Sequence, residues 1–226
     1  MRFSLVKILS FNAGYLDTAS FLALNGLFAA HVTGNFVTLG AAWVSDSEQS
    51  ILPKLIALPI FCFTIFLVKI LHSYLHKQNK VSYDLLLKLI LFFLTVAAGV
   101  SVLFQYMAVS QLIYELIIGM SLVIAMAIQN ALQRLYWLKD PPSTVMTGST
   151  TQLMLDLAEY VTNSVNTTLQ KNVLKQKISK IFPTMLNFAL GCLMAACFYK
   201  FANEWLFVMA PFIFTLAYTQ RENFNK

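Results

Sequence analysis

Hydrophobic residues are gathered in six long blocks along this chain, separated by short polar connections. A helix needs about 20 apolar residues to cross a lipid bilayer. Each block therefore predicts a membrane-spanning helix. The predicted spans cover, approximately, residues 8–30, 55–75, 85–109, 115–132, 181–199 and 205–219.

Two shorter stretches, residues 35–44 and 149–165, are too short or too polar to cross alone. Each follows a Thr-Gly pair: "VTGNFVTLG" at 32–40 and "VMTGSTTQLM" at 145–154. Since a Thr-Gly pair turns the chain and starts a helix, we expect two short helices here. They re-enter the membrane or lie at its surface.

Composition supports a membrane protein. The 226 residues are 58% hydrophobic and 12% charged, whereas soluble domains carry about 25% charged residues. Too little polar surface remains to cover a soluble globule. We therefore expect an all-α polytopic helical bundle that forms a single membrane domain with the lipid bilayer around it.

The basic residues orient this bundle. With the N-terminus in the cytoplasm and six crossings, fourteen of the 16 lysines and arginines fall on the cytoplasmic side, and the exceptions are Lys54 and Lys200. This asymmetry follows the positive-inside rule and places both termini in the cytoplasm. It also explains the net charge of +6 without nucleic acid, for which no recognition module is visible.

The chain contains a weak internal repeat. When "GYLDTASFL" (14–22) is written over "AIQNALQRL" (127–135), Asp17 stands over Asn130, and the two Thr-Gly pairs then align with a shift of one residue. The halves are residues 1–110 and 111–226, with three predicted spans each. Because three is odd, the second half enters from the opposite side, as in the inverted repeats of secondary transporters.

These paired motifs resemble the YoaK-type family of uncharacterised bacterial inner-membrane proteins, and the resemblance covers nearly the whole chain. It implies a multi-pass protein of the bacterial inner membrane and no established substrate. The family's Gly-x-x-x-Gly-like pattern in the fifth span is represented by Gly191 and Ala195.

Asp17 is the first candidate for function. A charge in the middle of a bilayer costs about 2.5–3.5 kcal/mol on insertion scales, so it needs a cavity, a partner or a proton. It serves either as a proton or cation relay and solute contact, or as a structural hydrogen-bond partner of Gln129 or Asn130.

The Thr-Gly breaks are the second candidate. Thr33 or Asn35 can cap the helix that follows, and Gly34 permits a tight backbone. The N-terminus of such a helix attracts an anionic group. The alternative is that both breaks are simple helix caps between packed spans.

The second break offers similar chemistry. Ser149 and Gln152 have the spacing of a capping box, and Thr147, Gly148 and Thr150 surround them. Gln129 and Asn130, near the end of the fourth span, either line the same cavity or bind neighbouring helices.

Other chemistry is sparse. His31 precedes the first break and could titrate near neutral pH. His72 and His76 have metal-ligand spacing without a third ligand nearby, so we expect no metal or cofactor. The three cysteines have no redox spacing, and no enzyme motif is present.

The sequence thus predicts a carrier, not an enzyme, for an unknown small polar or anionic solute, coupled to protons and working by rocking one half against the other. The alternative is a membrane protein that binds or stabilises a partner. For a chain this short we consider a homodimer, although no pattern shows one. The expected binding residues are Asp17, Thr33, Gly34, Asn35, Gln129, Asn130, Thr147, Gly148, Ser149 and Thr150.

Overall fold

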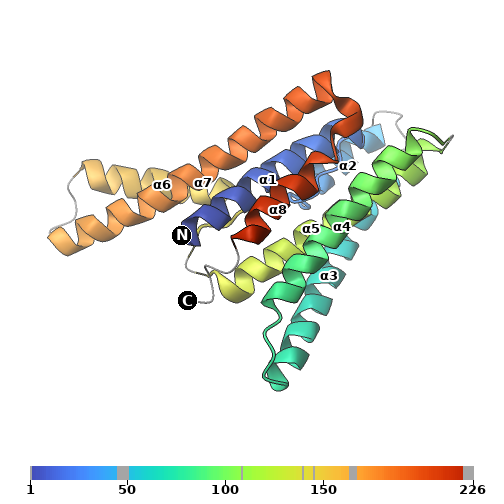
Figure 1. Cartoon of the computed structure of the whole chain (residues 1–226). Helices are drawn as coiled ribbons and strands as arrows, with labels where there is room; N and C mark the ends of the chain where they lie inside the picture. Colours follow the sequence, from blue (N-terminus) through green and yellow to red (C-terminus); the bar gives the residue numbers. More distant parts are fainter. Residues whose placement is uncertain are drawn as a thin grey trace.

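The computed structural model describes residues 2–44, 51–107, 109–138, 140–144, 146–162 and 167–220, and it is helical in all of its regular parts. Most helices run side by side along one axis (Figure 1). Their bounds are α1 Arg2–Ala23, α2 Gly34–Val44, α3 Ile51–Lys77, α4 Tyr83–Phe104, α5 Gln111–Tyr136, α6 Met146–Val161, α7 Thr168–Phe201 and α8 Met209–Thr219, with a 3₁₀ turn, η2, at Asn203–Trp205.

Four helices are long and apolar enough to cross a membrane, namely α3, α4, α5 and α7. The described residues confirm the expected all-α class, and these four helices fit a helical membrane bundle by their length and composition. Helix α1 has 22 residues, and α8 has 11 after the 3₁₀ turn. The last predicted span is therefore only partly one regular helix, and the count of six spans stays a prediction.

The predicted bounds of two other segments were wrong for local reasons. The first span ends at Ala23, before residue 30, because Asn25 and Gly26 adopt positive φ angles of 48° and 82°. The Gly26 N–H donates to the Phe21 carbonyl at 2.9 Å, which closes the helix end. The fifth predicted span corresponds to α7. It was expected to begin at residue 181, but the helix begins 13 residues earlier, at Thr168. The second short helix was expected to reach residue 165, and residues 163–165 lie outside the described part.

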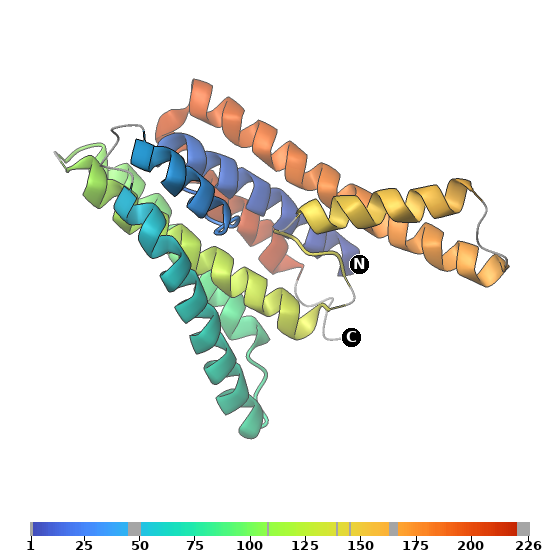
Figure 2. The same cartoon turned by 180° about the vertical axis from the view of Figure 1, so that it is seen from behind.

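Helices of the two halves pack in exchanged pairs. Helix α1 packs on α7 of the second half, and α5 packs on α3 of the first. Likewise α5 packs on α4 while α1 packs on α8, and each short helix, α2 or α6, packs on the long helix that follows it. The long–short–long order of the first half recurs in the second (Figures 1 and 2).

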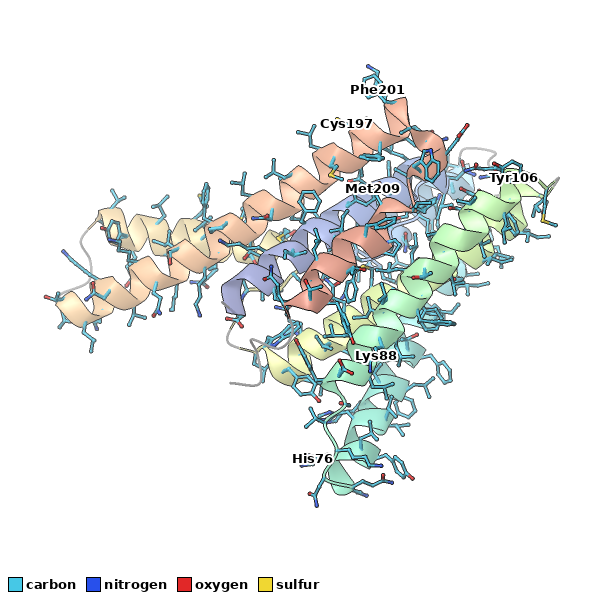
Figure 3. The ribbon with its side chains drawn as sticks, in the orientation of Figure 1. His76, Lys88, Tyr106, Cys197, Phe201 and Met209 are labelled. Carbon is cyan, nitrogen blue, oxygen red and sulfur yellow. The ribbon has the colours of Figure 1, made fainter. Side chains whose placement is uncertain are left out.

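The two ends of the bundle differ in composition. The start of α1 and the end of α8 lie at one end (Figure 1), on the side of His76 and Lys88 (Figure 3), whereas Tyr106 and Phe201 lie at the opposite end. The α6–α7 hairpin extends beyond the other helices (Figure 2). Its α7 arm carries four lysines: Lys171, Lys175, Lys177 and Lys180.

Helices α1 and α7 meet backbone to backbone. A methyl group added at Gly14 would lie 2.1 Å from the Phe188 carbonyl oxygen, and one added at Gly191 would lie 2.0 Å from the Phe11 carbonyl oxygen. Ala195, one turn along α7, is fully buried. Glycines that allow such close contact are typical of helix pairs in membranes, and this contact forms one wall of the site described next.

Candidate functional site

The Asp17 side chain holds the chain that returns from the end of α1. Its Oδ1 accepts hydrogen bonds from the backbone N–H groups of Ala30 (2.6 Å) and His31 (3.2 Å). Its Oδ2 is paired with His31 Nδ1. Asp17 lies about 9 Å below the end of α1 at 1.5 Å per residue, so residues 24–31 run back alongside the helix. The prediction that Asp17 binds Gln129 or Asn130 was wrong.

The Asn35 side chain forms hydrogen bonds with the returning loop and does not cap α2. Its Oδ1 accepts from the Phe28 N–H at 2.8 Å, and its Nδ2 donates to the Phe28 carbonyl at 2.9 Å. Asn35 is 1% exposed, and it binds both backbone polar groups of Phe28. The first N–H groups of α2 donate to the preceding turn, as from Gly34 to His31 at 2.8 Å. The start of α2 therefore offers few free donors to an anion.

A cavity of about 530 Å³ opens beside Asp17, between α1, the returning loop, the start of α2 and α7. This volume lies within the usual range for small-molecule sites. Thr33 and Gly34, two of the expected binding residues, line it, and α7 contributes Phe188 and Cys192.

The His31 ring stands between aromatic rings at the cavity. It meets Phe28 and Phe188 edge to face, with centroid distances of 6.4 and 5.7 Å. Because an ionised Asp17 only accepts hydrogen bonds, Nδ1 carries a proton. The other nitrogen, Nε2, makes no hydrogen bond to a described residue, and the side chain is 32% exposed. His31 can therefore gain or lose a proton on its cavity side.

The second break is held in a similar way by neutral groups. Asn130 Oδ1 accepts from the Thr144 hydroxyl at 2.6 Å, and Asn130 Nδ2 donates to Met126 one turn back. Thr144 stands three residues before Thr147, as Ala30 stands three residues before Thr33. The aligned side chains of Asp17 and Asn130 thus reach corresponding points of the returning chain.

Two glutamines complete the second network. Gln129 Nε2 donates to Ser143 Oγ at 3.1 Å and to the Leu9 carbonyl at 3.3 Å. Gln133 donates to the Pro141 carbonyl and accepts from the Ser143 N–H at 2.9 Å. These bonds fix the linker between α5 and α6 and join it to α1.

The second Thr-Gly motif lies inside a helix. Helix α6 begins at Met146, so Thr147, Gly148, Ser149 and Thr150 belong to its first turns. The Thr150 hydroxyl donates to the Met146 carbonyl at 2.8 Å. The expected capping box does not form, because Gln152 donates instead to Asp156 Oδ1 at 2.7 Å.

The predicted residues therefore separate into two groups. Asp17, Thr33 and Gly34 meet at the cavity, with Asn35 supporting the loop beside it. Gln129 and Asn130 form the neutral network, and the four residues of the second motif lie on α6. No hydrogen bond between described residues joins Asp17 to Asn130, and the cavity beside Asp17 is lined by the first break and not by the second.

A second buried charged group was missed. Glu115 at the start of α5 is fully buried, and its Oε1 accepts from Asn25 and from Gln111. Lys54 on α3 is 6% exposed and lies near both Glu115 and Gly26. Together they hold the outer turn of the returning loop. Lys54 was one of two exceptions to the charge asymmetry, which was a signal for an internal role.

The histidine pair has a structural setting. His72 Nδ1 and the Ser82 hydroxyl lie 2.9 Å apart, and Ser82 also bonds to Tyr136 at 2.8 Å. These contacts join the ends of α3 and α5. Among the described residues no group of three or more His, Cys, Asp or Glu side chains could hold a metal ion.

Comparison with known proteins gives a family. A family model described as "Protein of unknown function (DUF1275)" matches residues 5–219. No curated protein and no solved structure is detectably similar to the chain. Because the match covers nearly the whole chain, the protein belongs to the DUF1275 family of proteins of unknown function.

Proposed function

We propose that the protein is a proton-coupled carrier for a small solute in the bacterial inner membrane. The observation that carries this proposal is the Asp17–His31 pair, which is buried on the carboxylate side and exposed to a cavity on the histidine side. Histidine is the side chain whose charge changes most readily between about pH 5 and 8. A proton taken up at Nε2 would change the charge of the cavity wall.

The carrier mechanism requires an element that can move. Residues 24–33 link α1 to α2, and the side chains of Asp17, Asn35 and Glu115 bind this segment. A carrier would exchange such contacts when the cavity changes the side to which it opens. Non-helical backbone at membrane depth is found where it lines a cavity or is covered by protein.

Inverted halves would provide the rocking motion. The recurrence of long and short helices and the exchanged pairing of α1–α7 and α5–α3 support this part of the proposal. In transporters built from inverted repeats, one half rocks against the other around a fixed site. The lysines in the first half of α7 support a cytoplasmic location for the end of the bundle at which α1 begins.

Labelling of Cys192 tests the proposal without a known solute. Cys192 lines the cavity, and replacing Cys62 and Cys197 with Ala leaves it as the only thiol. A membrane-impermeant maleimide is applied to right-side-out and to inverted vesicles. A carrier exposes the cavity to each side in turn, so we expect Cys192 to react from both sides.

The matched control keeps Cys197 alone, by replacing Cys62 and Cys192. Cys197 is exposed on α7, five residues further along, and points away from the bundle (Figure 3). Facing lipid, it is expected to react from neither side. Reaction of Cys192 from one side only, in every condition, would contradict a carrier.

One observation favours the alternative, a protein that binds a partner. The α6–α7 hairpin extends beyond the bundle and exposes Leu155, Val161 and Leu169 beside its lysines. If this is the functional surface, truncating the hairpin should abolish binding of a partner while replacing Asp17 should not.

A further inference from the structure

We propose that the cavity beside Asp17 binds a small organic cation with an apolar body, in exchange for the proton on His31. This inference rests on the proposed function and replaces the expected polar or anionic solute with a cationic one. It follows from the charges that face the cavity, from the direction of its hydrogen bonds and from its aromatic walls.

Few titratable groups face the cavity. Helix α1 contributes Asp17, the returning loop contributes His31 and α7 contributes Cys192. The start of α2 contributes Thr33 and Gly34, which do not titrate. No lysine or arginine is among the residues that line it. With a neutral thiol, the net charge of the site is zero when His31 is protonated and −1 when it is neutral.

This balance favours exchange of one cation for one proton. When His31 loses its Nε2 proton to water and a monovalent cation enters, the net charge of the occupied site stays at zero. An anion bound to the protonated pair would instead leave an uncompensated negative charge away from water, which is costly. The Asp17 carboxylate also has no other cationic side chain at the cavity to neutralise it once His31 is deprotonated.

The cavity walls fit the same ligand. Phe21, Phe28 and Phe188 line it, and Leu22 adds apolar surface. The rings of Phe21 and Phe28 lie 4.9 Å apart, so they form a continuous aromatic wall. Aromatic faces attract quaternary ammonium groups and other weakly hydrated cations. Apolar walls around one buried carboxylate are therefore suited to a cation with a hydrophobic substituent.

Benzyltrimethylammonium is a suitable probe, because it carries a permanent charge and an aromatic ring. Its binding to the purified protein is measured by calorimetry at several pH values, in pairs of buffers whose ionisation enthalpies differ. We expect saturable binding that weakens as the pH falls, with close to one proton released per cation below neutral pH. Benzoate and neutral neopentylbenzene serve as ligands of similar size, and we expect both to bind at least tenfold more weakly.

Four variants identify the groups involved. Asp17→Asn keeps an acceptor for the backbone N–H groups and removes the charge, so we expect at least tenfold weaker binding. His31→Gln should bind the cation without releasing a proton. Phe188→Leu should weaken binding about 3- to 30-fold through loss of a cation–π contact. Phe182→Leu, an exposed position on the same helix, should leave it unchanged.

The outcomes separate this inference from the proposed function. Benzoate binding more tightly than the cation, or cation binding by the native protein without proton release, would overturn the inference. If Cys192 is labelled from both sides and no cation binds, the carrier stands and the cation does not. If the cation binds but Cys192 reacts from one side only, the site is real and the carrier is wrong. Should Asp17→Asn fail to fold, His31→Gln and Phe188→Leu still decide.

Discussion

The first break, at Thr33–Gly34, and the second, at Thr147–Gly148, are held by aligned side chains in different chemical settings. Asp17 binds the backbone at Ala30 and also pairs with His31. Asn130 binds the Thr144 hydroxyl within a network of neutral groups. The first site opens on a cavity, whereas the bonds of the second fix the linker that leads to α6.

This difference separates a structural requirement from a chemical capacity. Either a carboxylate or an amide can hold the returning chain, because both provide an acceptor oxygen. A carboxylate at membrane depth needs a compensating charge. His31 supplies a positive charge when its ring is protonated, and this charge is lost when the ring releases a proton. We therefore assign function to the first break and support of the fold to the second. The following predictions test that assignment, from the largest expected effect to the smallest.

Removing the two aligned side chains should have unequal effects. Asp17→Ala leaves the Ala30 N–H and the buried edge of His31 without an acceptor, and we expect a loss of about 3–5 kcal/mol in unfolding free energy. Asn130→Ala removes one neutral bond between side chains and should cost about 1 kcal/mol. Thermal unfolding in detergent measures both. Equal losses would mean that the Asp17 charge has no special role.

The residues after the glycines provide a second comparison. Asn35→Ala removes two hydrogen bonds to the Phe28 backbone, and we expect a loss of about 2–3 kcal/mol. Ser149→Ala, at the aligned position inside α6, should change stability by less than about 1 kcal/mol. A Ser149→Ala variant as unstable as Asn35→Ala would show that the second motif also holds its surroundings. The same unfolding measurement applies.

Replacing each of the two glycines with Ala should change the stability in opposite directions. At Gly148 an added methyl group meets nothing within 4 Å, so Gly148→Ala should stabilise α6 by about 0.5–1 kcal/mol through helix propensity. At Gly34 the methyl group would lie 3.0 Å from the Phe28 ring. Because Asn35 fixes the Phe28 backbone, the ring has little room to retreat, and we expect a loss of about 0.5–1 kcal/mol. Stabilisation by Gly34→Ala would show that Phe28 is free to move.

Much of the fold could be predicted from the sequence, because an apolar segment long enough to cross a membrane forms a helix there in most cases. Helix ends were predicted less well. The Asn25–Gly26 turn lies inside a stretch that reads as one apolar segment, and the 3₁₀ turn before α8 has no clear composition signal. The polar first half of α7 was read as a connection because hydropathy detects spans and does not detect helix outside them.

The site could be predicted in part. An acid inside an apolar block identified Asp17, and the Thr-Gly pair identified the loop beside it. The partner of Asp17 could not be found from the repeat, because alignment relates equivalent positions and does not report contacts. His31 is local in sequence, fourteen residues from Asp17, yet pairing requires the chain to turn back after α1. Glu115 was missed because an acid before an apolar run reads as a helix end.

Proton flux in reconstituted vesicles tests the central claim most directly. Proteoliposomes are loaded with the pH indicator pyranine, and benzyltrimethylammonium is added outside. In the native protein and in Asn130→Ala, each cation that enters the vesicle should exchange for one proton that leaves it. Internal pH should therefore rise for these two proteins and stay constant for Asp17→Asn. An equal rise with Asp17→Asn would contradict the account.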